Sequence, residues 1–134
     1  MESNGRASEK LRVLLVEDEC LIAAWAAECL SEQGFAVQTA SHAGEALRHL
    51  ASAPVDVLVT DINLPGGMDG AALARRAREL LPQLPVIYAS ACAGMLAPEA
   101  LVAGAFLVGK PYEARTIARL IAAAARPASE PACG

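Results

Sequence analysis

The stretch Leu11-Arg-Val-Leu-Leu-Val-Glu-Asp-Glu19 is an apolar run that ends abruptly in three acidic residues. Three later runs have the same form, an apolar stretch followed at once by a polar side chain. They are residues 55–60 before Asp61, residues 85–89 before Ser90, and residues 105–109 before Lys110. Strands that are apolar throughout, rather than alternating, are typical of a parallel sheet buried on both faces. Because parallel strands end at one edge of a sheet, we expect these polar side chains to meet there.

Apolar strand runs alternate with helical segments five times along the chain. We expect strands at about 11–16, 35–39, 55–60, 85–89 and 105–109, and helices near 20–33, 42–52, 69–81, 97–103 and 112–125. This alternation implies right-handed crossovers and an α/β, doubly wound five-stranded parallel sheet. The expected strand order is 2-1-3-4-5, the flavodoxin-like arrangement. One domain should cover residues 11–126, with flexible tails at 1–10 and 127–134.

Two local signals mark helix ends. Gly34 follows the first expected helix, where a left-handed residue commonly ends the helix. Ser41 precedes the second expected helix and is a residue type that caps helix N-termini, with Glu45 in the opening turns. His42 and His49 belong to the same helix and have no metal-ligand spacing, so we expect surface histidines.

Composition excludes several functions. The net charge of −4 argues against direct nucleic-acid binding, because neutralising phosphates requires clustered Lys and Arg. The densest basic stretch, Arg75-Arg76-Ala-Arg78, is interpreted as the solvated face of a helix. No apolar run reaches the roughly 20 residues that span a bilayer, and the polar residues 1–10 do not resemble a signal peptide. The four cysteines lack CxxC spacing, so we expect reduced thiols in a cytoplasmic protein.

The expected cluster of carboxylates has a charge problem. Two carboxylates about 5 Å apart repel by roughly 3 kcal/mol at an effective dielectric constant of about 20. Three acids with Lys110 beside them would still carry two negative charges. A divalent cation would cancel these charges, and an all-oxygen site of this kind suits Mg²⁺.

These residues, in this order, resemble the receiver domain of two-component response regulators. The resemblance covers about residues 11–125 and is carried by four segments, VLLVEDE (13–19), DINLPGGMDG (61–70), PVIYASA (85–91) and GKPY (109–112). It implies that Asp61 is the phosphoryl acceptor. The implied metal ligands are Glu17, Asp18, Asp61 and the backbone carbonyl of Asn63, with Mg²⁺ as the ion and Mn²⁺ as an alternative.

The resemblance also implies roles for residues around this centre. Lys110 would pair with a phosphoryl oxygen, Ser90 would bond the phosphoryl group and report its presence, and the peptide bond before Pro111 would be cis. Ile22 and Trp25 would lie on the helix face that docks the kinase. Simple burial of Trp25 is an equal alternative at this stage.

Two departures from the family pattern affect these expectations. The loop after Asp61 is one residue longer than usual, and Gly66-Gly67 would absorb the extra residue through positive φ. The usual switch aromatic lies three residues before the lysine, where this chain has Leu107. Phe106 is four residues before the lysine, so Phe106 is a candidate for the switch only if the strand shifts its register.

The implied function is signalling rather than enzymatic. The chain would take a phosphoryl group from a sensor histidine kinase or a histidine phosphotransfer protein. It would then signal to a downstream protein through a changed surface around the fourth strand, fourth helix and fifth strand. The sequence leaves open whether the chain forms a homodimer.

Three other functions were weighed. A pseudo-receiver that acts without phosphorylation is disfavoured by the intact acidic and lysine set. A Mg²⁺-dependent phosphatase of the haloacid dehalogenase type requires Asp-x-Asp after the first strand, where this chain has Glu17-Asp18-Glu19. A flavin-binding module would place its phosphate against those same acids, which would repel it.

Overall fold

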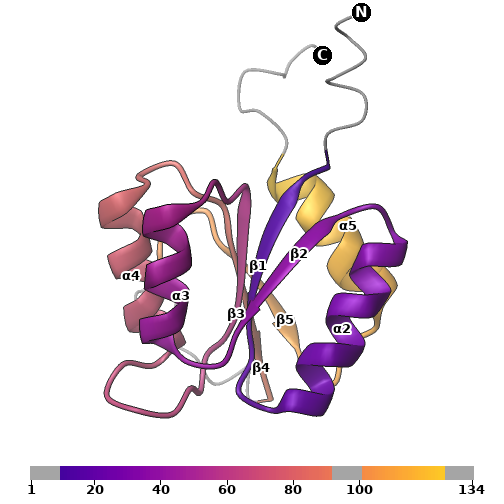
Figure 1. The fold of residues 1–134 in the computed structure, drawn as a ribbon, viewed down its shortest axis with the longest axis horizontal. Helices are drawn as coiled ribbons and strands as arrows, with labels where there is room; N and C mark the ends of the chain where they lie inside the picture. The colour runs from indigo at the N-terminus through magenta and orange to yellow at the C-terminus, as the bar shows by residue number, and fades with distance from the viewer. Residues whose placement is uncertain (1–9, 92–100, 126–134) are drawn as a thin grey trace, which may run out of the picture.

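Five parallel strands form a central sheet with helices packed on both of its faces (Figure 1). The computed structural model describes residues 10–91 and 101–125. The strands are β1 (Arg12–Val16), β2 (Ala36–Ala40), β3 (Val57–Asp61), β4 (Val86–Ser90) and β5 (Phe106–Gly109). The helices within the described ranges are α2 (Cys20–Glu32), α3 (Ala43–Ser52), α4 (Gly70–Leu80) and α5 (Ala114–Ala124).

The strand order across the sheet is β2-β1-β3-β4-β5, which confirms the predicted topology. All neighbouring strands are parallel, so their carboxyl ends lie at one edge, at the bottom of Figure 1. The register brings the polar ends level with one another. Asp61 pairs with Ala89, and Ser90 pairs with Gly109, which directly precedes Lys110.

The core has two layers, one on each face of the sheet. Leu14 and Val16 of β1 pack toward α3 and α4, whereas Val13 and Leu15 pack toward α2 and α5. Each of these four side chains is at most 2% exposed. A strand buried on both faces must be apolar at every position, which explains the uninterrupted run that opens the sequence.

Helix ends agree only in part with the expected signals. Gly34 has φ +100° just after α2, as predicted. The cap of α3 is His42 rather than Ser41, because the helix begins one residue later than expected. The Nδ1 of His42 accepts the Glu45 backbone N–H at 3.2 Å, and the Ser41 N–H donates to the Glu45 carboxylate at 2.9 Å. His42 therefore has a structural role at a helix N-terminus.

Some expectations fall outside the described residues. The helix expected over 97–103 lies mostly within 92–100, which is outside them, and residues 101–103 form a bend and turn rather than a helix. The tails expected at 1–10 and 127–134 also lie outside, apart from Lys10. No helix in the described part of the chain combines the length and apolar character needed to cross a bilayer.

Candidate functional site

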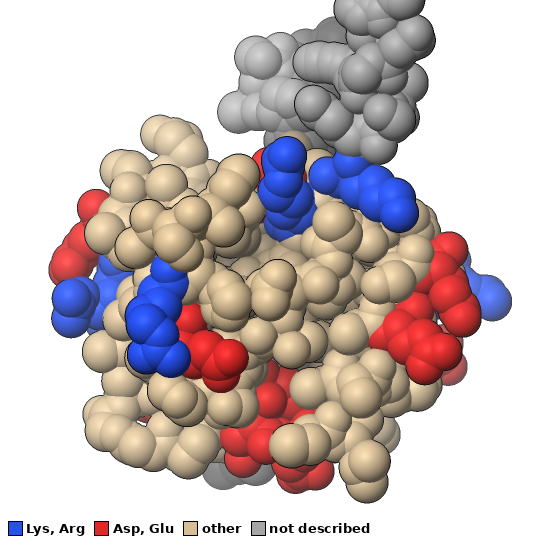
Figure 2. Space-filling view, in the orientation of Figure 1, with Lys and Arg blue, Asp and Glu red and all other residues tan. Residues whose placement is uncertain are grey.

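The carboxyl edge of the sheet buries several polar groups that the sequence places at strand ends. Glu17 directly follows β1, Asp61 is the last residue of β3, and Ser90 is the last residue of β4. These residues are only 3%, 7% and 2% exposed. Figure 2 shows acidic side chains gathered at the lower edge, where the strands of Figure 1 end. Burying polar groups costs free energy unless they have partners, so three buried polar residues at one edge indicate a binding site or active site.

Lys110 joins two of the acids. Its Nζ donates to Glu17 Oε1 at 3.1 Å and to Asp61 Oδ2 at 3.2 Å. The Lys110 side chain is 18% exposed, against 2% and 9% for the two carboxylates. The ammonium group therefore lies between two largely buried carboxylates. Lys110 directly follows β5, so its side chain reaches past the end of β4 to contact both acids.

The protonation equilibria reflect this partial burial. Burial raises the pKa of Asp61 above its ordinary value, and the charge and hydrogen bond of Lys110 only partly oppose that effect. Burial by itself would lower the pKa of Lys110. The hydrogen bonds and charges of Glu17 and Asp61 outweigh burial, so the pKa of Lys110 lies above its usual value. Both shifts show that Lys110 and Asp61 form one electrostatic unit.

Three acids are close enough to hold one cation. Oxygen atoms of Glu17, Asp18 and Asp61 all lie within 4.8 Å of one another. Asp18 is exposed, whereas the other two are buried, so a cation could reach the cluster from solvent. Hard oxygen donors with excess negative charge fit Mg²⁺ or Mn²⁺. The residues present therefore suit the predicted metal.

The neighbours of this cluster have separate positions. Glu19, which directly follows Asp18, is the N-cap residue of α2, and its N–H donates to Glu17 Oε2 at 3.1 Å. Its side chain makes no capping hydrogen bond. Asn63 lies two residues after Asp61, and a hydrogen bond from its backbone N–H favours the ionised Asp61 carboxylate. Metal ligation by the Asn63 carbonyl stays a prediction.

The loop after Asp61 contains a glycine that sequence reasoning missed. The Gly70 N–H donates to Ile62 O at 2.7 Å. A Cβ on Gly70 would overlap the backbone oxygen of Asp61 and lie 2.8 Å from the Ile62 Cα. Gly70 thus lets the start of α4 lie directly against the backbone of Asp61 and Ile62. The absence of a side chain at the helix start was the available signal. Of the glycine pair in this loop, only Gly66 has positive φ, at +92°.

The switch position needs a correction. Side chains alternate along a strand, so Tyr88 and Ser90 share one face of β4. Tyr88 packs in the α3 and α4 layer and pairs with Leu107, whereas Phe106 packs in the opposite layer with α2 and α5. Regular pairing of β4 with β5 leaves no register shift that would turn Phe106 toward Ser90. Leu107, which is 37% exposed, lies on the same face of the sheet as Tyr88 and Ser90. Phe106 would lie on that face only after a register shift.

A groove between α2 and the segment after β5 adjoins Lys110. It has a volume of about 630 Å³ and is lined by Glu19, Ile22, Trp25, Ala91, Lys110, Pro111 and Tyr112. Trp25 is 45% exposed, so simple burial does not describe it. Its ring centroid lies 6.1 Å from that of Tyr112, a residue that sequence reasoning did not single out. The Lys110–Pro111 peptide bond is cis, the conformation expected at that position.

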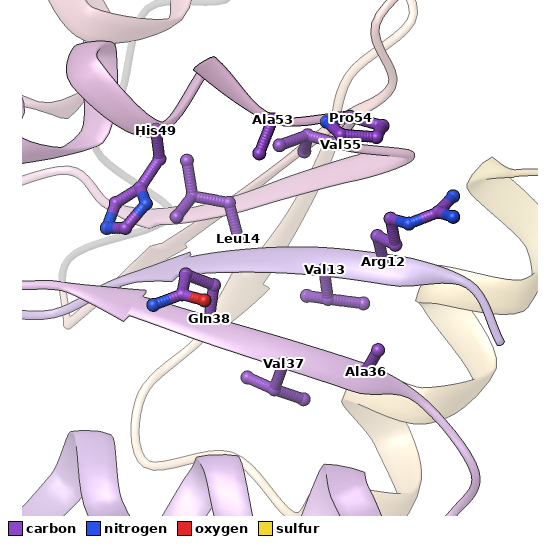
Figure 3. Close-up of a pocket in the computed structure, with 10 residues that line it drawn as sticks. All are labelled: Arg12, Val13, Leu14, Ala36, Val37, Gln38, His49, Ala53, Pro54 and Val55. Atoms are coloured by element: carbon purple, nitrogen blue, oxygen red, sulfur yellow. The ribbon is translucent and has the colours of Figure 1, made fainter. Parts of the chain in front are cut away.

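A second groove lies away from this centre. Figure 3 shows side chains of β1, β2, α3 and the segment after α3 around this groove. Its volume is about 250 Å³. Its lining contains Arg12 and His49 but no carboxylate. The groove therefore lacks the donors for a divalent cation, and His49 has no acidic partner there that would suggest a metal site.

Comparison with known proteins agrees with this geometry. Residues 13–122 match the response regulator receiver domain family. The chain is 32% identical over 108 residues to the response regulator receiver protein CpdR of Brucella abortus, an alignment that covers 79% of this chain and 89% of CpdR. A crystal structure of a response regulator receiver protein from Sinorhizobium medicae WSM419 matches with a TM-score of 0.82 at 28% identity, over 87% of this chain and 95% of that chain. The chain belongs to the response regulator receiver domain family.

Other relatives are much longer than this chain. The DNA-binding transcriptional regulator NtrC of Escherichia coli strain K12 is 38% identical over 104 residues, but the alignment covers only 22% of NtrC. The alignment with the sensor kinase/phosphatase CqsS of Vibrio cholerae covers 12% of that protein. As a class, receiver domains are signalling phosphoacceptors of two-component systems and are not counted among enzymes.

Proposed function

We propose that this chain accepts a phosphoryl group on Asp61 from the phosphohistidine of a sensor histidine kinase or a histidine phosphotransfer protein. One observation carries the proposal. The Asp61 carboxylate is nearly buried, bonded to Lys110 at 3.2 Å, and placed within 4.8 Å of two further acids. A structural aspartate would not need both a partly buried lysine and two like charges beside it.

The transfer follows from the positions of the side chains. An Asp61 oxygen attacks phosphorus, the phosphorus–nitrogen bond breaks, and the imidazole leaves with the bonding electron pair to be protonated by solvent. Lys110 then exchanges its bond to the carboxylate for one to a phosphoryl oxygen, as a point charge that needs little reorientation. Glu17, Asp18, Asp61 and the Asn63 carbonyl would hold Mg²⁺. Bound Mg²⁺ supplies charge neutralisation of the phosphoryl oxygens.

The response starts at Ser90. Its hydroxyl lies at the carboxyl edge, on the strand next to Asp61, and would bond the phosphoryl group once it forms. Movement of Ser90 would alter the surface around the carboxyl ends of β4 and β5 and the segment directly after Ser90, and a downstream protein would read that change. This role requires no direct contact with nucleic acid or membrane. The proposed compartment is the cytoplasm, and the free thiols of Cys20 and Cys29 are compatible with it.

The test is phosphorylation by a small donor. Incubation with acetyl phosphate and Mg²⁺, followed by peptide mass spectrometry, should place one phosphoryl group on Asp61 and none without a divalent cation. Asp61→Asn should abolish the label. Asp56→Asn is a matched control, because Asp56 flanks the other end of β3 and should not affect labelling. An unlabelled wild-type protein would favour the pseudo-receiver alternative, and a label that survives Asp61→Asn would refute the acceptor assignment.

The kinase docking role of α2 is a separate part of the proposal. Trp25 and Ile22 line the groove next to Lys110, where an incoming histidine would have to approach. A half-exposed Trp at a groove is a typical binding hot spot. Trp25→Ala should therefore reduce phosphotransfer from the cognate kinase by about 10-fold or more while leaving acetyl phosphate labelling unchanged.

A matched control separates docking from folding. Leu21 is 85% exposed on the same helix and does not line the groove. Leu21→Ala should leave both phosphotransfer reactions close to wild type. Equal losses of Trp25→Ala in the kinase and acetyl phosphate reactions would indicate a folding defect instead of docking.

A further inference from the structure

The turn before β5 is held by side chains from two different elements. The Val102 N–H donates to the Tyr88 hydroxyl at 3.1 Å, and Arg78 Nη2 donates to the Ala103 carbonyl at 3.0 Å. The turn closes on itself through the Ala105 N–H and the Val102 carbonyl at 3.3 Å, with Gly104 at φ +74°. Residues 102–105, the β5 turn, are therefore fixed at two points besides their own backbone hydrogen bond.

Both anchoring side chains are themselves immobilised. Tyr88 is fully buried among the side chains of the α3 and α4 layer, against which Val102 and Ala105 also pack. Burial raises the pKa of the Tyr88 phenol above its usual value, so the hydroxyl stays neutral throughout the physiological range. Arg78 also donates through Nε to the Leu84 carbonyl at 2.7 Å, which fixes its guanidinium plane. A hydrogen bond between two fixed groups loses little entropy when it forms.

Tyr88 is two residues from Ser90 on the same strand and the same face. On β5 the corresponding position is Leu107, which has no polar group, and Phe106 faces the other layer. Among the described residues of β4 and β5, the aromatic side chain on the Ser90 face thus belongs to β4. Its hydroxyl is bonded to the backbone of the β5 turn rather than directed toward the acceptor.

We propose that Tyr88 and Arg78 clamp the β5 turn to the core, so that the turn stays fixed when a phosphoryl group on Asp61 draws in Ser90. The clamp itself does not depend on the phosphoacceptor function. The second part, that the turn stays fixed on phosphorylation of Asp61, rests on that proposed function. The clamp makes the β5 turn a static part of the surface. The hydrogen bond between the Tyr88 hydroxyl and the Val102 N–H prevents the turn from moving together with Ser90. Removal of that hydroxyl would let the turn respond.

Amide hydrogen exchange of the full chain tests both halves, with beryllofluoride and Mg²⁺ as the phosphoryl mimic. Tyr88→Phe removes only the hydroxyl, and Tyr112→Phe is the matched control at a tyrosine outside the clamp. Without the mimic, Tyr88→Phe should speed exchange of the Val102 amide by at least about 10-fold, since that amide loses its partner. Tyr112→Phe should leave it unchanged. Equal Val102 exchange in the wild type and Tyr88→Phe overturns the clamp.

With the mimic, the wild type should change at the amides of residues 61–63 and at Ser90 but not at residues 102–105. In Tyr88→Phe the change should spread to residues 102–105. A wild-type response in the β5 turn as large as that of Tyr88→Phe refutes its static role. Absence of any response near Asp61 would instead count against the phosphoacceptor function, and the clamp would then be decided by the measurements without mimic. Unchanged circular dichroism of Tyr88→Phe verifies that the variant is folded.

Discussion

The two edges of the sheet each carry an acid–base pair, and the pairs differ mainly in exposure. At the carboxyl edge, Lys110 and Asp61 are 3.2 Å apart with side chains 18% and 9% exposed. At the amino edge, Arg12 and Asp56 are 3.8 Å apart with side chains 46% and 37% exposed. Water and salt screen the amino-edge pair, so its contribution to stability is expected to be small. Burial makes the carboxyl-edge pair sensitive to every nearby charge.

The charge balance differs as well. At the amino edge one base meets one acid, and the backbone N–H of Arg12 also donates to Asp56 at 2.7 Å. At the carboxyl edge one lysine faces the three acids of the cluster. Buried charges without full compensation oppose folding, so a protein that retains them uses them for chemistry. The number of unmatched charges, rather than the number of ion pairs, therefore distinguishes the carboxyl edge from the amino edge.

Removal of Lys110 should have the largest effect. Lys110→Ala should slow labelling by acetyl phosphate on the order of 100-fold or more, because the lysine stabilises charge on the transferring phosphoryl group. The rate can be followed by mass spectrometry over time. Arg12→Ala, the corresponding change at the amino edge, should leave the rate unchanged. A loss below about 3-fold for Lys110→Ala would remove the functional distinction between the two edges.

Gly70 should be the next most sensitive position, in stability rather than in rate. Gly70→Ala forces a Cβ into the Asp61 and Ile62 backbone and should reduce the free energy of unfolding by about 3 kcal/mol, measured by urea denaturation. Gly67→Ala is the control, because a Cβ there would meet nothing within 4 Å. Similar unfolding midpoints for the two variants would show that the loop relaxes around the added methyl group.

Asp61→Asn should increase the stability of the metal-free protein, whereas Asp56→Asn at the amino edge should not. In metal-free buffer at pH 7 the variant should be more stable than the wild type by about 1 kcal/mol, since it removes one of three mutually repelling carboxylates. Mg²⁺ should then stabilise the wild type more than the variant. Asp56→Asn should show no such gain at the exposed edge. Equal Mg²⁺ shifts in melting temperature for wild type and Asp61→Asn would contradict the proposed metal site.

The same pair of proteins has a defined pH dependence. The folded-state pKa of Asp61 lies above the ordinary value of 3.8, so the folded wild type binds this proton more tightly than the unfolded chain does. The associated stability is fully present below pH 3.8 and is lost as pH rises through the folded pKa. The advantage of Asp61→Asn should therefore be near zero at low pH, grow through that window and then level off. Urea midpoints across pH in the presence of EDTA measure it.

The smallest effect is expected at the amino edge. Arg12→Ala should change the free energy of unfolding by less than about 1 kcal/mol, and the change should shrink further in high salt. Urea denaturation at low and high ionic strength provides the measurement. A salt-independent loss well above this range would mean that the exposed pair is as important as the buried one.

Several residues of the site escaped sequence reasoning for identifiable reasons. Gly70 was missed because a glycine at a helix start is only a weak local signal and does not show which backbone lies against it, here that of Asp61. Tyr112 and Tyr88 were missed because each contacts a residue far along the chain, Trp25 and Val102 respectively. The face on which Phe106 lies could not be decided from the sequence, because it depends on the register of β5 with β4.

The sequence by itself determined the strand-helix alternation, the 2-1-3-4-5 order and the set of polar residues at the strand ends. Uninterrupted apolar runs that alternate with helical segments are typical of buried parallel strands, and parallel strands necessarily end together. Only the tertiary structure decided which side chains touch. Lys110 lies between Glu17 and Asp61 because its long side chain, which follows β5, reaches the acids at the ends of β1 and β3 along the shared carboxyl edge. Contacts of that kind depend on packing distances and register across the sheet, which short-range sequence patterns do not contain.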